Sequence, residues 1–139
     1  MITSKITIDA TVSATPEKVW EFWTQPKHIT QWNFASDDWC CPSAENDLTV
    51  GGKYKARMEA KDGSFGFDFE GTYDQIVDHN KIVYTISDRR QVVTLFEDLG
   101  SSTKITTTFE AESENPIEMQ RDGWQAILDN FKNYADYKK

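Results

Sequence analysis

The sequence contains little cysteine and little histidine, and this limits the metal and redox chemistry open to it. Its two cysteines, Cys40 and Cys41, are adjacent, and neighbours in sequence rarely form a disulfide because the geometry is strained. They also lack the C-x-x-C spacing of zinc and redox sites. The two histidines, His28 and His79, lie in polar surroundings. We therefore expect free thiols, no metal and no cofactor.

Long hydrophobic runs are also absent. The amino-terminal segment Met1–Lys5 has no apolar stretch of the signal-peptide type, and the longest unbroken apolar runs are only a few residues. A helix that spans a membrane needs about 20 apolar residues. We expect a soluble chain without membrane insertion and, because of its unpaired cysteines, a cytoplasmic location.

Basic residues are scarce relative to acidic ones. The chain has 15 Lys and Arg against 23 Asp and Glu, which gives a formal net charge of −8. Binding to the phosphates of nucleic acid or to an anionic membrane needs clustered Lys and Arg, and the sequence has no such stripe. This composition argues against both partners, and the negative charge itself is typical of a soluble surface.

Recognisable catalytic motifs are missing as well. Gly51-Gly52 matches neither phosphate-binding glycine pattern and indicates a bend in a strand. The acidic residues Asp37-Asp38, Glu45 and Asp47 fall in a predicted loop, where carboxylates are usually solvated rather than tuned for acid–base work. Neither histidine has the context of a Ser-His-Asp triad. We name no catalytic residue, and the sequence favours a binding protein over an enzyme.

Aromatic side chains, in contrast, are abundant. The 139 residues include five Trp, five Tyr and eight Phe. Each such ring buries about 150–250 Å². A small chain with this many rings has either a crowded core or a cavity lined by them. The length fits a single domain over residues 1–139, and no repeat or linker interrupts it.

The amino-terminal part predicts one strand and two short helices. Residues 2–12 alternate between apolar and polar side chains, which is typical of a half-buried strand. The apolar members are Ile2, Ile6, Ile8, Ala10 and Val12. Thr15 is placed to cap a helix with Pro16 at its first position. Pro26 then begins a second short helix.

From about Asp47 to Glu112 the pattern predicts consecutive hairpins. Alternating segments are separated by the turn signals Asp62-Gly63, a strong two-residue turn, His79-Asn80 and 99–101. The segments are residues 53–60, 65–74, 82–86, 92–97 and 103–111. Consecutive hairpins form an antiparallel sheet with one wet face.

The last segment predicts a long helix that ends near Tyr137. Asn115 and Glu118 form a capping-box pattern, with Pro116 in the first turn. The apolar stripe consists of Ile117, Trp124, Ile127, Leu128, Phe131 and Tyr134. The result is an α+β chain in which one curved sheet buries its inner face on this helix. A strongly bent sheet and one helix leave a cavity between them.

Several segments together resemble a known family. The segments are Ala14–Trp20, Gln31-Trp32, Asp47–Tyr54, Asp62-Gly63, Gly71, Gly123-Trp124 and Leu128. In order and spacing they resemble the homologues of the activator of the 90-kDa heat-shock chaperone ATPase, which belong to the START-like (SRPBCC) superfamily with the helix-grip fold. The resemblance covers essentially the whole chain.

The resemblance implies a deep cavity between sheet and C-terminal helix that takes an apolar or amphipathic small molecule. It leaves two alternatives open. One is a co-chaperone-like module of the stress response that stimulates a heat-shock chaperone ATPase, although that activator is larger and carries an additional domain. The other is a cyclase-like enzyme that uses the same cavity. The chain itself is expected to be a monomer or a homodimer.

Periodicity and resemblance together name ten candidate ligand-binding residues. They are Trp32, Tyr54, Met58, Phe67, Phe69, Tyr73, Tyr84, Phe109, Trp124 and Leu128. The three tyrosines are the best candidates for polar contacts, because a buried hydroxyl needs a partner.

Other apolar positions favour structural roles. Phe65, Phe67 and Phe69 are more typical of plain core than of a ligand cage. Trp32, Phe34 and Trp39 are expected to plug one end of the sheet rather than to rim a cavity mouth. Gly123 lies inside the long helix, where Gly costs about 1 kcal/mol relative to Ala, so tight packing on the sheet is expected to compensate.

Overall fold

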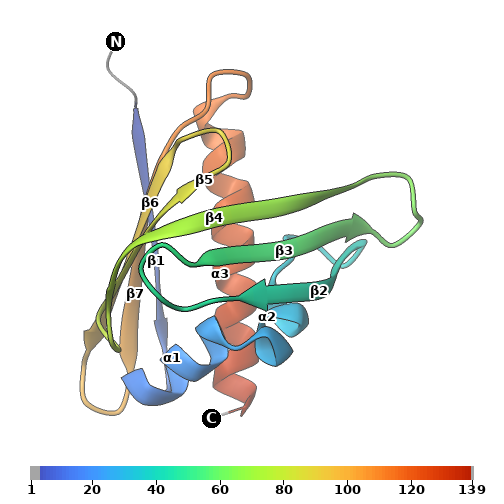
Figure 1. Ribbon diagram of the computed structural model, residues 1–139. Coiled ribbons are helices and arrows are strands. Elements are labelled where there is room, and N and C mark those ends of the chain that lie inside the picture. Colours follow the sequence, from blue (N-terminus) through green and yellow to red (C-terminus); the bar gives the residue numbers. More distant parts are fainter. Residues whose placement is uncertain (1–3, 139) are drawn as a thin grey trace.

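The computed structural model describes residues 4–138, and it contains one sheet and three helices (Figure 1). In chain order the elements are β1 (Lys5–Val12), α1 (Pro16–Thr24), α2 (Pro26–Trp32), β2 (Trp39–Asn46), β3 (Lys53–Ala60), β4 (Gly66–Val77), β5 (Lys81–Ile86), β6 (Gln91–Asp98), β7 (Thr103–Glu110) and α3 (Ile117–Lys138). The predicted strand residues Ile2 and Thr3 lie outside the described residues.

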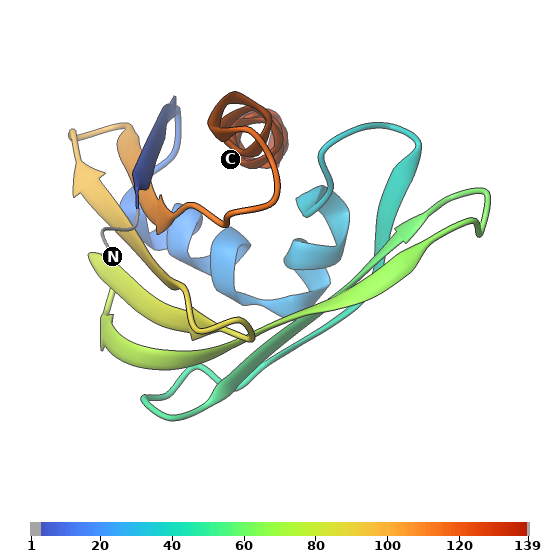
Figure 2. The same cartoon turned by 90° about the horizontal axis from the view of Figure 1, so that it is seen from above.

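The sheet is antiparallel, with strand order β1-β7-β6-β5-β4-β3-β2. Strands β2 to β7 form consecutive hairpins, and β1 adds to the free edge of β7. The sheet curls around α3, while α1 and α2 lie across one end of the concave face (Figure 2). This arrangement confirms the expected α+β helix-grip fold.

Strand β1 has the alternation that the sequence predicts. Its burial pattern is strictly alternating, and Ile6, Ile8 and Val12 face the core. Opposite them on β7, Ile6 pairs with Phe109. On the outer face the hydroxyls of Thr7 and Thr108 are hydrogen-bonded across the two strands at 3.0 Å. Burial of apolar side chains on one face and a threonine pair on the other stabilise the pairing of β1 with β7.

Helices α1 and α2 begin at Pro16 and Pro26, as expected. The predicted cap by the Thr15 side chain is wrong, because that side chain makes no capping hydrogen bond. Thr15 is exposed, so water can satisfy the free amides of the first turn. The Thr15 carbonyl still accepts the first helical hydrogen bond, from the amide of Val19 at 2.9 Å.

Strand β2 was not predicted, since the hairpins were expected to begin at Asp47. It carries Pro42 and a register shift between Cys40 and Ser43, and it alternates poorly. Proline is tolerated on an edge strand because one side of that strand needs no ladder hydrogen bonds. Glu45, expected in a loop, pairs with Lys55 of β3. Gly51-Gly52 lies in the turn between β2 and β3 rather than within a strand.

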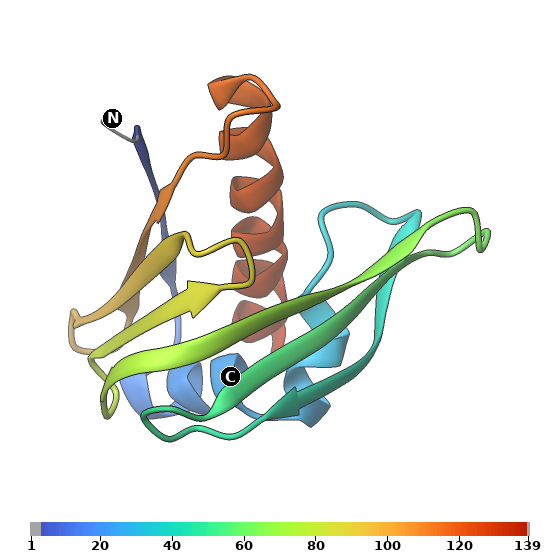
Figure 3. The ribbon, with the colours of Figure 1, turned by 45° about the horizontal axis from the view of Figure 1, so that its top comes forward.

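The hairpin of β3 and β4 projects beyond the helices (Figure 3). Its connection covers residues 61–65, longer than the two-residue turn that Asp62-Gly63 suggested. The prediction of Phe65 and Phe67 as core is wrong, because their exposed fractions are 60% and 41%. The hairpin tip lies past the end of the core, so these rings are covered only in part, by contact with Trp39 of β2.

Helix α3 starts at Ile117 and ends at Lys138. The predicted capping box is not formed, because the amide of Asn115 donates to Glu112 at 2.7 Å instead of to Glu118. The side-chain amide of Gln120 donates to the carbonyl of Asn115 at 2.8 Å and closes the turn before the helix. Ile117, predicted to be on the apolar stripe, is 41% exposed because the first turn extends beyond the sheet.

Gly123 does not pack tightly against anything. A Cβ atom built at this position would meet no atom within 4 Å. The expectation that close packing on the sheet explains this glycine is therefore wrong. Within residues 4–138, no neighbour requires the absence of a side chain at this position.

No helix within residues 4–138 is long and apolar enough to cross a membrane.

Candidate ligand-binding cavity

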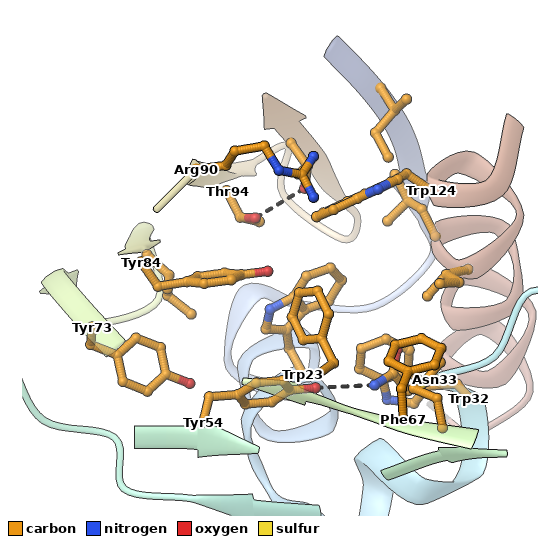
Figure 4. Close-up of a pocket in the computed structure, with 17 residues that line it drawn as sticks. Trp23, Trp32, Asn33, Tyr54, Phe67, Tyr73, Tyr84, Arg90, Thr94 and Trp124 are labelled. Atoms are coloured by element: carbon orange, nitrogen blue, oxygen red, sulfur yellow. Dashed lines mark hydrogen bonds between the residues drawn. The ribbon is translucent and has the colours of Figure 1, made fainter. Parts of the chain in front are cut away.

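A cavity of about 250 Å³ lies between the concave face of the sheet and helices α1, α2 and α3 (Figure 4). Its lining is mostly apolar. The lining residues are Ile8, Trp23, Trp32, Asn33, Tyr54, Met58, Phe67, Phe69, Tyr73, Ile82, Tyr84, Arg90, Thr94, Thr107, Trp124, Ile127 and Leu128.

Stacked tryptophans form one end of the cavity. Trp23 of α1 and Trp32 of α2 stack with ring centroids 5.1 Å apart, and Phe131 of α3 meets both rings edge-on at 4.9 and 4.8 Å. Trp32 also donates from its ring nitrogen to the carbonyl of Phe22 at 2.9 Å. Trp32 therefore plugs one end of the sheet, as expected, and lines the cavity as well.

Phe34 and Trp39 pack beside this end rather than in the cavity. Both contact the small cluster of Cys41, Ala56 and Met58. The thiol of Cys41 is buried, and burial raises its pKa to about 11. Cys40 and Cys41 are both free, as expected.

Helix α3 contributes Trp124 to the cavity lining, and an aromatic ring of β7 stacks on it. Trp124 stacks on Phe109 with centroids 4.0 Å apart and an interplanar angle of 12°. Trp124 also meets Phe69 of β4 at 6.2 Å, edge to face. The cavity wall at this point is therefore formed by packed aromatic rings.

Nine of the ten residues predicted from the sequence line the cavity, and Phe109 does not. Phe109 has the inward parity of the others, but Trp124 covers it, so its exposed fraction is 1%. That the nine lining residues bind a ligand stays a prediction.

The three tyrosines point inward, and their hydroxyls differ in their partners. Tyr54 accepts a hydrogen bond from the side chain of Asn33 at 3.1 Å, and Tyr73 donates to that of Asn46 at 2.6 Å. The Tyr84 hydroxyl has no hydrogen-bond partner among residues 4–138. Burial raises the pKa of all three phenols, so each stays protonated at neutral pH and is able to donate.

Sequence reasoning missed Arg90, which lies just after the β5–β6 turn and lines the cavity. Its Nε donates to Asp88 at 2.8 Å, and its Nη1 donates to the carbonyl of Glu110 at 2.9 Å. The segment Asp88-Arg89-Arg90 is typical of a solvated turn, and its local pattern contains no signal that would separate Arg90 from Arg89. Only the curl of the sheet turns Arg90 toward the cavity.

A pair of threonines adds polarity to the same wall. Thr94 of β6 and Thr107 of β7 lie opposite each other in register, and their hydroxyls are hydrogen-bonded at 3.0 Å. Both are buried, with exposed fractions of 1% and 4%. Their inward parity was visible in the alternation of the two strands, but threonine was not considered as a lining residue.

Carboxylates and imidazoles do not line the cavity within the described part of the chain. Among the described lining residues there is no Asp, Glu or His. Within residues 4–138 there is also no group of three His, Cys, Asp or Glu side chains placed to hold a metal ion. His28 lies outside the cavity, and its surroundings are less polar than expected, because its ring contacts Phe22 edge-on at 4.9 Å.

Comparison with known proteins matches this chain to one family. The family model described as Activator of Hsp90 ATPase homolog 1-like protein matches residues 13–136. A comparison with curated proteins found no match.

Several solved structures are similar over almost the whole chain. The AHSA1-like protein from Aeromonas hydrophila is 40% identical, with a TM-score of 0.91 over 96% of this chain and 93% of that one. A protein from Cytophaga hutchinsonii is 48% identical, with a TM-score of 0.83 over 96% and 92%. A protein from Chromobacterium violaceum, at 24% identity and a TM-score of 0.85 over 96% and 98%, shares the fold.

Proposed function

The chain belongs to the family of Activator of Hsp90 ATPase homolog 1-like proteins, and from this we propose that it is a single-domain binding protein for a small apolar or amphipathic molecule. The ligand occupies the cavity between the sheet and α3. The predicted cytoplasmic location and assembly as a monomer or a homodimer stay predictions.

The cavity itself is the observation that carries this proposal. Ligand pockets are concave and mainly apolar, with a few polar groups that orient the ligand. Here aromatic and aliphatic side chains form most of the lining, and the Tyr84 hydroxyl faces the interior without a partner among the described residues (Figure 4). Side chains in protein interiors pack closely, so a partly open apolar pocket of about 250 Å³ on the concave face is a specific feature.

The volume limits the size of the ligand. A cavity of roughly 150 Å³ holds benzene, and pockets for drug-sized ligands measure about 300–1,000 Å³. At about 250 Å³ this cavity suits a molecule of one or two rings, or an acyl chain of medium length.

Native mass spectrometry of freshly purified protein, compared with the denatured mass, tests the proposal directly. We expect a reproducible additional mass that extracts into organic solvent. Three tryptophans, Trp23, Trp32 and Trp124, line the cavity, so intrinsic fluorescence reports on ligands added to the apo protein.

A variant that fills the cavity separates specific binding from surface adsorption. Ile127→Trp places a larger side chain at a half-buried lining position of α3, and we expect it to weaken binding at least about tenfold. Met119→Trp is the matched control, because Met119 is on the same helix and 60% exposed. Equal binding by the two variants would contradict a ligand site in the cavity.

A protein-partner role is the second candidate, and an exposed aromatic cluster supports it. Trp39 at the start of β2 meets Phe65 and Phe67 of the projecting hairpin, and the three rings lie pairwise at 6.0 to 6.1 Å; Phe65 and Phe67 are exposed. Exposed apolar patches commonly mark interaction sites. The family name suggests a heat-shock chaperone ATPase as the partner.

Chaperone ATPase assays test this second candidate. Addition of the purified chain to a purified 90-kDa heat-shock chaperone is expected to raise the rate of ATP hydrolysis, and Phe65→Ser is expected to abolish the increase. Val77→Ser is the control, since Val77 is 42% exposed but lies at the opposite end of β4. No stimulation by the wild-type chain would exclude this role.

A further inference from the structure

Most polar groups of the cavity lining are able to donate hydrogen bonds: the guanidinium of Arg90 and the hydroxyls of the tyrosines and threonines. Arg90 is the one charged side chain in the lining that the structure describes, although the whole chain carries a net charge of −8. A cation in the lining of an apolar cavity, without a carboxylate beside it in that lining, favours an anionic or strongly hydrogen-bond-accepting ligand group.

The contacts of Arg90 orient its guanidinium but occupy only some of its hydrogen-bond donors. A guanidinium has five N–H donors. One contacts Asp88 and one contacts the carbonyl of Glu110, so the others have no partner among residues 4–138. The Asp88 side chain is 53% exposed, while that of Arg90 is 20% exposed, so solvent screens the attraction between the two.

Two further donors lie on the same wall as Arg90. Figure 4 shows Tyr84 and Thr94 below Arg90, opposite Trp124. The Tyr84 hydroxyl proton has no acceptor among the described residues, and the Thr94–Thr107 pair uses only one of its two hydroxyl protons for the bond between them. A ligand that presents only apolar atoms here would leave these donors unpaired, which is unfavourable in a dehydrated site.

We propose that the cavity binds an amphipathic carboxylate, with its carboxylate held by Arg90, Tyr84 and the Thr94–Thr107 pair, and its apolar body against Trp124 and Phe69. This inference rests on the proposed small-molecule function and adds the ligand class to it. The flat face of Trp124, supported by Phe109, and the edge of Phe69 form a slot for the apolar part.

Two matched pairs of probes test the head group. 2-Naphthoate and 2-naphthamide have nearly the same shape but differ in charge, and octanoate and octanamide repeat the comparison on a flexible chain. Calorimetric titration into the apo protein at neutral pH gives the affinity of each. We expect at least one carboxylate to bind roughly ten- to a hundredfold more tightly than its amide, because hydrogen bonds to charged groups are the stronger ones.

Charge-matched variants then test the residue. Arg90→Gln is expected to reduce the preference for the carboxylate to less than about threefold. Arg89→Gln removes the same charge from the neighbouring, exposed position and is expected to keep the preference. Tyr84→Phe is a second variant that removes only a hydroxyl, and we expect it to weaken the carboxylate several-fold.

The outcomes distinguish this inference from the function on which it rests. Equal affinities for carboxylate and amide in the wild-type protein would overturn the inference and leave a neutral apolar ligand in the cavity. An unchanged preference in Arg90→Gln would overturn the role of Arg90. Failure of all four probes to bind at millimolar concentration would contradict the proposed function and the inference together.

Discussion

At the scale of single residues, the cavity tyrosines differ in what their hydroxyls contribute to stability. Tyr73 donates to Asn46, whose own amide donates to the carbonyl of Thr24 at 2.6 Å and so ties β2 to the end of α1. The Tyr84 hydroxyl has no such partner among the described residues. The same phenol group therefore stabilises the fold at one position and is available to a ligand at the other.

We expect Tyr73→Phe to lower the free energy of unfolding by about 1–2 kcal/mol, because Asn46 loses its donor. Tyr84→Phe is expected to change it by less than about 0.5 kcal/mol. Urea denaturation of the two variants, followed by tryptophan fluorescence, measures both values. The reverse order of the two effects would contradict the hydrogen-bond assignment.

Gly123 offers a substitution that should stabilise the protein. A Cβ there meets open space, so Gly123→Ala is expected to raise the free energy of unfolding by about 1 kcal/mol through helix propensity alone. Gly71→Ala is the contrasting variant, because its Cβ would lie 2.8 Å from the ring of Tyr84 and is expected to destabilise the chain. Destabilisation by Gly123→Ala would show that this glycine has a role that its surroundings do not reveal.

At the scale of elements, His28 joins the three helices. Its Nδ1 is hydrogen-bonded to the Tyr134 hydroxyl of α3, its Nε2 lies 3.3 Å from Glu21 of α1, and the residue itself is on α2. Burial lowers the pKa of His28 below its ordinary value of 6.5, and the nearby Glu21 opposes this only in part. The neutral imidazole is therefore the form that fits this junction.

Acidification is expected to weaken the packing of these helices. Because the pKa of His28 is lower in the folded chain, the unfolded chain takes up the proton first as the pH falls through 6.5, and the free energy of unfolding then decreases. Denaturation between pH 7.5 and about 5 measures the slope, which His28→Gln should reduce. A steeper slope in His28→Gln would contradict this account.

At the scale of the whole molecule, burial is uneven across the sheet. Strands β6 and β7 contain fully buried side chains such as Val92, Ile105 and Phe109, whereas β2 is an edge strand with a bulge. The projecting hairpin of β3 and β4 ends in exposed rings. The sheet is therefore most deeply buried at β6 and β7, and its β2 edge is less buried although α2 packs on it.

We expect the rates of amide hydrogen exchange to follow this difference in burial across the sheet. Amides of β6 and β7 should exchange most slowly, with protection close to that of global unfolding, and those of β2 and the hairpin tip should exchange fastest. Exchange measured by NMR or mass spectrometry at neutral pH gives the profile. Equal protection in β2 and β7 would contradict it.

Local patterns in the sequence were enough to predict the architecture and most of the cavity lining. Residue parity in a strand and the spacing of three or four in a helix are local properties, so they place Ile6, Tyr84 and Leu128 on the correct faces without any knowledge of distant contacts. Strand parity accounts for six of the nine predicted residues that line the cavity, and the other three, Trp32, Trp124 and Leu128, are on helices. Turn signals and amphipathic stripes were enough to predict the order of strands and helices in the helix-grip fold.

Features that depend on distant parts of the chain came from the tertiary structure alone. Strand β2 exists because β3 offers it an edge, and Phe67 is exposed because its hairpin extends past α3. Phe109 shares the inward parity of its neighbours, yet Trp124 covers it. Arg90 follows a turn that is polar in sequence, and the curl of the sheet turns it into the cavity. Local periodicity sets which way a side chain points, but what lies opposite it is set by the packing of the whole chain.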